Sequence, residues 1–86
     1  MHELSVAMEI CHLAERHAGA GGAGAVRVVA VDMGDAAGLE PANLAFCLET
    51  LLASPPFGKA RPLLQRVPGH DLRVAWLEVD DGRPDD

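Results

Sequence analysis

We expect the fold to be organised around Val26-Arg27-Val28-Val29-Ala30-Val31, in which five of six residues are apolar and four are valine. A short run of β-branched residues that is apolar on nearly both faces is typical of a strand in the middle of a sheet. We therefore expect a central strand at residues 26–31. Glycine and aspartate are frequent at residues 32–38, which predicts a turn after the strand.

A helix is expected on each side of this strand. Apolar residues recur at helical spacing over residues 4–18, with Ser5 as a cap near the start and Gly19 just beyond the end. After the strand, Pro41 suits the first position of a second helix. The apolar stripe of that second helix consists of Leu44, Cys47, Leu48 and Leu51.

The loop between the first helix and the central strand contains the pattern G-x-G-x-x-G, from Gly19 to Gly24. This pattern binds a dinucleotide when it follows a strand and opens a helix, because the helix N-terminus supplies amide groups to the phosphates. Here it follows a helix and leads into a strand. We interpret it as a flexible loop.

Two more strands are expected, at Arg61–Val67 and Leu72–Val79. Pro62 lacks an amide hydrogen and so favours an edge position for the first of them. Alternation predicts that Leu72, Val74 and Trp76 share one face of the second. Since only a tight connection separates these two strands, we expect them to pair antiparallel as a hairpin.

The order α-β-α-β-β predicts an α+β fold, with two helices packed on a three-stranded mixed sheet as a two-layer sandwich. With 86 residues, the chain is expected to form a single domain over residues 1–79. Residues 80–86 are acidic and lack an apolar anchor, which predicts a disordered tail.

The formal net charge of −6, with no cluster of lysine or arginine, argues against a nucleic-acid partner. No apolar run approaches the roughly 20 residues of a membrane span. The first residues also lack the basic start and apolar block of a signal peptide. These features predict a soluble cytoplasmic protein with no membrane partner.

Few side chains suggest catalysis. No serine–histidine–acid set has a recognisable context, and Ser5 and Ser54 both lie near expected helix ends, so we do not expect an enzyme. Cys11 and Cys47 fall on apolar helical stripes and are interpreted as small buried hydrophobes. His12 and His17 are interpreted as solvated helix residues and His70 as a turn residue. Of these three, His70 is the best candidate for a metal ligand, because the neighbouring Asp71 would orient its ring.

The feature with the clearest chemistry is Met1-His2-Glu3. A free N-terminal amine, the imidazole of His2 and the amide between them can close adjoining chelate rings on a metal such as Ni(II), which favours nitrogen donors. Glu3 adds a carboxylate, and a bulky second residue disfavours removal of Met1. Because a helix is expected to start immediately afterwards, the triplet would be held at a rigid position.

Five segments of the chain resemble the HypA/HybF family of hydrogenase nickel-incorporation proteins. They are the opening Met1-His2-Glu3-Leu4-Ser5-Val6, residues 28–34 around the central strand, residues 38–46 at the entry to the second helix, Pro56-Phe57-Gly58, and residues 71–79. These segments are distributed along almost the whole chain up to the acidic tail.

The resemblance implies a metallochaperone that helps to deliver Ni(II), as bound cargo, during [NiFe]-hydrogenase maturation. It implies that nickel is held at Met1, His2 and Glu3, and that an acidic residue at the start of the second helix, here Glu40, sometimes joins them. Glu40 is also explained by the helix dipole alone. The implied partners are the maturation GTPase HypB and the precursor of the hydrogenase large subunit. For the chain itself we expect a monomer or a weak homodimer.

The chain departs from the family pattern in one respect. Family members carry a zinc module with two C-x-x-C pairs before the last strand, whereas residues 67–71 bridge that place directly here. Zinc is therefore not expected. The departure leaves an alternative open, in which the chain is a HypA-like protein-interaction module that no longer delivers metal.

Overall fold

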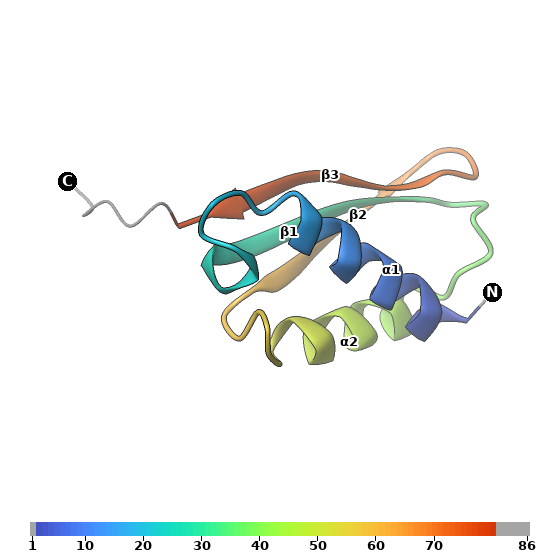
Figure 1. The fold of residues 1–86 in the computed structure, drawn as a ribbon. Helices are drawn as coiled ribbons and strands as arrows, with labels where there is room; N and C mark the ends of the chain where they lie inside the picture. Colours follow the sequence, from blue (N-terminus) through green and yellow to red (C-terminus); the bar gives the residue numbers. More distant parts are fainter. Residues whose placement is uncertain (1, 81–86) are drawn as a thin grey trace.

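The computed structural model describes residues 2–80, so Met1 and residues 81–86, which make up most of the predicted tail, lie outside the described part. Figure 1 shows a layer of two helices against a three-stranded sheet, which confirms the predicted α+β sandwich. The elements follow the order α1 (Glu3–Arg16), a 3₁₀ turn (Ala23–Ala25), β1 (Val26–Gly34), α2 (Pro41–Leu52), β2 (Arg61–Val67) and β3 (Leu72–Val79). Within residues 2–80, neither helix is long and apolar enough to cross a membrane.

Helix α1 begins earlier than predicted. His2 has an extended backbone and is the N-cap, and its carbonyl accepts the first helical hydrogen bond, from the amide of Val6 at 3.2 Å. Ser5 therefore lies inside the first turn, and its prediction as a cap was wrong. As a consequence, His2 and Glu3 stand at the rigid start of a helix.

Strand β1 is the middle strand of the sheet, as predicted, but the predicted hairpin was wrong. The sheet order is β2-β1-β3, with β2 parallel and β3 antiparallel to β1. Helix α2 carries the chain back to lie parallel to β1 on one side, and the connection after β2 then crosses to the other side. A β2–β3 hairpin would have left the valine-rich β1 as an edge strand, with its backbone groups unpaired on one side.

The connection between β2 and β3, residues 68–71, passes over the end of β1, and we call it the crossing connection. The amide of Gly34 donates to the carbonyl of Asp71 at 2.7 Å, and the amide of Ala36 donates to the carbonyl of Gly69 at 2.8 Å. These partners extend β1 through residues 32–34, which were predicted to form a turn. A Cβ atom at Gly34 would lie 2.7 Å from the carbonyl carbon of Gly69, so only glycine fits here.

The core lies between the helices and one face of the sheet. Val29, Val31 and Met33 contribute from β1, and the apolar stripes of both helices pack on them. The buried helical residues are Val6, Ala7, Ile10, Cys11, Ala14, Leu44, Leu48 and Leu52. The predicted burial of Cys11 is confirmed, and Cys47 is partly buried against the same core.

A β-bulge in β3 changes the face of Trp76. Ala30 pairs with Trp76 whereas the next residue, Val31, pairs with Val74, so β3 has one extra residue at this point. Leu77 takes the core-facing position and Trp76 lies on the opposite face, where it is 50% exposed. The prediction that Trp76 shares a face with Leu72 and Val74 was therefore wrong.

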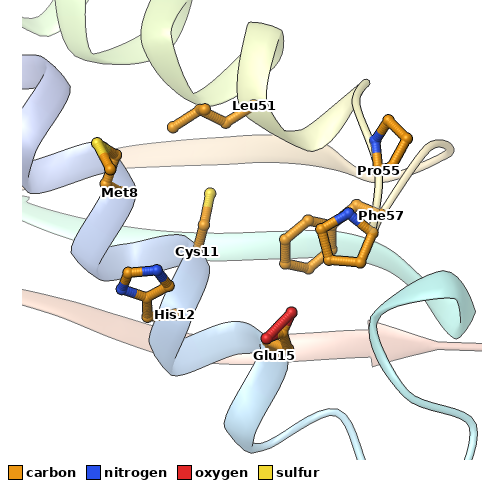
Figure 2. Close-up of a pocket in the computed structure, with 8 residues that line it drawn as sticks. Met8, Cys11, His12, Glu15, Leu51, Pro55 and Phe57 are labelled. Atoms are coloured by element: carbon orange, nitrogen blue, oxygen red, sulfur yellow. The ribbon is translucent and has the colours of Figure 1, made fainter.

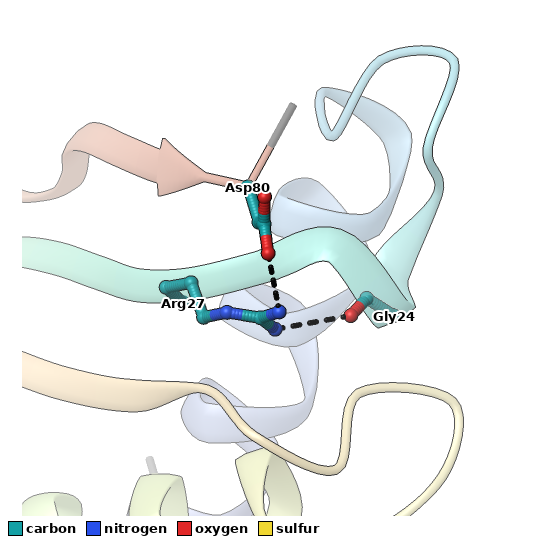
Figure 3. Close-up of polar contacts among 3 residues, drawn as sticks. All are labelled: Gly24, Arg27 and Asp80. Atoms are coloured by element: carbon teal, nitrogen blue, oxygen red, sulfur yellow. Dashed lines mark hydrogen bonds and ion pairs between the residues drawn. The ribbon is translucent and has the colours of Figure 1, made fainter. Parts of the chain in front are cut away.

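The start of β1 and the end of β3 are joined by polar contacts (Figure 3). A guanidinium nitrogen of Arg27 lies 2.8 Å from a carboxylate oxygen of Asp80, and a second donates to the carbonyl of Gly24 at 3.3 Å. The amide of Asp80 also donates to the carbonyl of Ala25 at 2.7 Å. Asp80, the first residue of the predicted tail, is thus anchored to the strand.

Candidate metal-binding site

His2 presents its ring to solvent at the start of α1. The residue is exposed, and its side chain makes no capping hydrogen bond, although the backbone caps the helix. The imidazole is therefore not needed to hold the helix. It remains available as a nitrogen ligand on a fixed backbone.

Glu3 connects α1 to the start of α2. One carboxylate oxygen, Oε2, accepts a hydrogen bond from the backbone amide of Glu40 at 3.0 Å. This bond is the main cause of a pKa of Glu3 below its ordinary value. The carboxylate is therefore ionised at neutral pH, and the contribution of this contact to stability is lost only as the pH falls through the lowered folded pKa.

Glu40 is the N-cap of α2. Its Oε2 atom accepts a hydrogen bond from the amide of Asn43 at 2.8 Å, which satisfies a free N–H of the first turn. Two carboxylates thus lie at one helix N-terminus, and each uses one oxygen there. A carboxylate has about four lone-pair sites, so both retain capacity for a cation.

The structure places His2 and Glu3 in one shallow depression. Asn43 and Cys47, one helical turn apart on α2, line the same depression and were not predicted as site residues. The spacing Glu40-x-x-Asn43, which continues to Cys47, was the sequence signal that could have placed them on this face. Because the side chain of Cys47 also packs against the core, we interpret it as part of the wall of the depression.

The side chains alone do not form a closed metal site. Within residues 2–80, no group of three histidine, cysteine, aspartate or glutamate residues is arranged to hold a metal ion. Met1, whose amine is the remaining predicted donor, lies outside the described residues. The geometry thus offers an exposed imidazole in one depression with the Glu3 carboxylate, and the remaining coordination positions are left to backbone nitrogen or water.

The other histidines lie elsewhere. His17 is the C-cap of α1, and His12 is exposed on the same helix. The Nδ1 atom of His70 lies 3.2 Å from the carbonyl oxygen of Ala36. His70 thus contacts the backbone at Ala36, and the structure shows no hydrogen bond from its ring to Asp71 within residues 2–80.

A second depression lies between α1 and the C-terminal end of α2 (Figure 2). Cys11 extends its thiol from α1 toward α2, and Leu51 and Phe57 form the opposite wall. Burial raises the pKa of the Cys11 thiol to about 11. The thiol therefore stays protonated at neutral pH and is a poor metal ligand.

The difference in exposure of the two cysteines predicts a difference in their reactivity. At neutral pH we expect iodoacetamide to modify Cys47 at least about tenfold faster than Cys11, which is only 7% exposed and almost fully protonated. Peptide mass spectrometry over a time course would measure both rates. In denaturant the two rates should converge, and equal rates in the folded protein would contradict the burial of Cys11.

Comparison with known proteins identifies a family. The model of the family described as "Hydrogenase/urease nickel incorporation, metallochaperone, hypA" matches residues 1–78. Hydrogenase maturation factor HypA of Streptomyces avermitilis is 39% identical over 70 residues, which are 80% of this chain and 53% of that protein. The factor of the same name from Geobacter metallireducens is 32% identical over 69 residues, which are 80% of this chain and 60% of that protein.

The fold is also found among solved structures. The solution structure of the Ni metallochaperone HypA from Helicobacter pylori aligns with a TM-score of 0.75 and 19% sequence identity, covering 93% of this chain and 98% of that one. At this identity the likeness shows the fold alone. The curated relatives are longer than this chain, which spans between half and two thirds of their length.

Proposed function

Because this chain belongs to the HypA family, we propose that it binds Ni(II) at the start of α1 and passes the ion on during [NiFe]-hydrogenase maturation. The observation that supports this proposal most is the position of His2, whose exposed imidazole stands at a rigid helix start beside the ionised carboxylate of Glu3. The proposed ligands are the Met1 amine, the intervening backbone nitrogen, His2 and Glu3. Glu40 is a neighbouring carboxylate that tunes the site.

Open coordination suits delivery. A closed cage of protein ligands would hold the ion too tightly to hand it over, whereas an exposed site lets an acceptor approach and exchange ligands one at a time. We therefore expect a micromolar dissociation constant, which corresponds to a binding free energy of about −8 kcal/mol. Competition with a colorimetric chelator tests this point: full and rapid release supports a delivery role, and retention against the chelator contradicts it.

The two carboxylates are expected to contribute unequally. Glu3→Gln keeps a hydrogen-bond acceptor for the Glu40 amide but removes the charge beside His2, and should weaken nickel binding about tenfold. Glu40→Gln should change binding less than about threefold, because that side chain mainly caps α2. Calorimetric titration would measure both changes.

Glu49→Gln is the matched control for these variants, since it removes one negative charge near the C-terminal end of α2, away from Glu3 and Glu40. If all three variants weaken binding equally, the effect is one of net charge, and the proposed role of Glu3 as a ligand fails. If Glu40→Gln has the larger effect, Glu40 is a ligand in its own right.

We propose the maturation GTPase HypB and the hydrogenase large-subunit precursor as partners, on the basis of the family. A nickel-transfer assay with purified components would test this. Nickel should move to the GTPase or the precursor faster from the protein than from buffer, and no acceleration would argue against delivery.

A second candidate function is a protein-interaction module without metal, because no three side chains within residues 2–80 form a metal site. The two candidates differ in the role of the N-terminal amine. Fusion of a short peptide ahead of Met1 should abolish nickel binding if the chain is a chaperone. The same fusion should leave partner binding unchanged if the chain is only a module.

We also propose that residues 1–86 bind no zinc, perform no catalysis and act in the cytoplasm. Neither cysteine belongs to a C-x-x-C pair, and Cys11 and Cys47 lie on different helices as packing residues. Elemental analysis of protein purified without chelators should find far less than one zinc per chain. A stoichiometric amount of zinc would contradict this part of the proposal.

A further inference from the structure

The face of the sheet opposite the helices carries an ordered arrangement of side chains. Because Val29, Val31 and Met33 point into the core, alternation turns Val28, Ala30 and their neighbours to the other face. The strand register arranges nine residues on that face in three rows: Arg61, Val28 and Glu78; Leu63, Ala30 and Trp76; Gln65, Asp32 and Arg73. We call these nine residues the open face.

The middle row of the open face is apolar and unpartnered. Leu63 on one edge strand and Trp76 on the other are each 50% exposed, and the small Ala30 lies between them. A shallow trough results, lined by Leu63, Trp76 and the residues of the first row. Exposed tryptophan on a flat apolar surface is typical of the centre of a protein interface.

The charges of the open face are balanced and ordered. Arg61 stands at the β2 end of the first row and Glu78 at the β3 end, and neither makes an ion pair with another residue in the described part of the chain. Arg73 and Asp32 form an ion pair of 3.3 Å in the third row. The face thus carries two positive and two negative groups, although the chain as a whole has a net charge of −6.

We propose that the open face binds a second copy of this chain, sheet against sheet. A twofold axis parallel to β1 places Arg61 of one copy over Glu78 of the other, and Leu63 of one over Trp76 of the other. The pairs Arg61–Glu78 and Leu63–Trp76 then each occur twice, as a symmetric interface requires. The β1 residues lie on the axis, so Asp32 faces Asp32 of the other copy, with each carboxylate paired to its own Arg73 at 3.3 Å. The neutral face also lets two acidic chains approach with the least mutual repulsion.

This dimer leaves the nickel site accessible. His2 and Glu3 belong to the helical layer, which covers the other face of the sheet (Figure 1). Nine residues make a small contact area, so the dimer should be weak, with a dissociation constant in the micromolar range. The inference is independent of the proposed function, since it requires no metal.

Trp76 reports directly on this contact, because it is the sole tryptophan of a chain that contains no tyrosine. The full chain, held in a metal chelator, would be followed by tryptophan emission and sedimentation velocity from about 1 µM to about 1 mM. We expect the emission maximum to shift to shorter wavelength over the same range in which the dimer appears. Emission independent of concentration, or a dimer that forms without a shift, overturns the proposal.

Charge reversal tests the symmetry of the dimer. Arg61→Glu and Glu78→Arg should each weaken self-association about tenfold or more, because two attractive pairs become repulsive. An equimolar mixture of the two variants should associate within about threefold of the natural chain, since every pair is again of opposite charge. A mixture that stays monomeric overturns the proposed axis and the face-to-face dimer with it.

Arg66→Glu is the matched control, because it reverses a charge on the same strand. The spacing of Arg66 from Leu64, which packs against the core, places Arg66 on the helical side of β2. Self-association should be unchanged in this variant. A loss equal to that of Arg61→Glu would show that net charge, rather than the open face, governs association, and would overturn the proposal.

Discussion

Replacement of His2 by alanine is expected to weaken Ni(II) binding by about 100-fold or more. The imidazole is the only side-chain nitrogen donor at the start of α1 within the described residues, and no other histidine lies in the same depression. The helix itself should persist, because the backbone of His2, and not its ring, caps α1. Calorimetric titration of the untagged protein at neutral pH measures the effect.

His12→Ala is the control for this prediction. His12 is also exposed on α1 but lies in the depression between α1 and the C-terminal end of α2 (Figure 2). Its loss should leave nickel affinity unchanged. If His12→Ala weakens binding as much as His2→Ala does, the metal is held by histidines in general and the assignment to the helix start is wrong.

Replacement of Gly34 by alanine is expected to lower the free energy of unfolding by about 3 kcal/mol. A Cβ atom at this position would lie 2.7 Å from the carbonyl carbon of Gly69 and 2.9 Å from the amide nitrogen of Asp71, both backbone atoms of the crossing connection. Backbone cannot rotate away as a side chain does, so the connection must move and its hydrogen bonds to the end of β1 must weaken. Urea denaturation followed by circular dichroism would measure the change.

Gly24→Ala is the matched control. A Cβ atom at Gly24 would meet nothing closer than the carbonyl oxygen of Pro56 at 3.9 Å, and the backbone there does not require glycine. Its stability should stay within about 1 kcal/mol of that of the natural chain. Equal losses for the two variants would show that the close approach at Gly34 is not what fixes the connection.

The sequence was sufficient to predict the elements because each has a local cause. The valines of β1 predicted a central strand, Pro41 predicted the start of α2, and Pro62 predicted an edge. The pairing of β2 and β3 with β1 could not be predicted in the same way. It depends on the pairing of both edges of β1 with neighbouring strands, which is a property of the whole sheet and not of residues 68–71.

The face of the sheet on which Trp76 lies could not be predicted from the sequence, for a related reason. Simple alternation fixes the face of a side chain only while the register is regular, and one extra residue in β3 reverses it. No local pattern in residues 72–79 marks the bulge. The open face, which depends on that reversal, therefore became visible only in three dimensions.

The site was predictable in part. His2 and Glu3 could be placed together because a helix holds consecutive residues in a fixed relation, and the structure confirms that this helix begins at Glu3. The link from Glu3 to the amide of Glu40 joins residues 37 positions apart. Only the packing of α1 against α2 creates that contact, and it explains why two carboxylates meet at one helix N-terminus.

X-ray absorption spectroscopy at the nickel K-edge, on the untagged protein loaded with one Ni(II), would test whether nickel binds at the start of α1. We expect a first shell of nitrogen and oxygen only, with scattering from one imidazole that disappears in His2→Ala. Sulfur in the first shell would contradict the proposed set of nitrogen and oxygen ligands. An imidazole signal that survives in His2→Ala would contradict a nickel site at the start of α1.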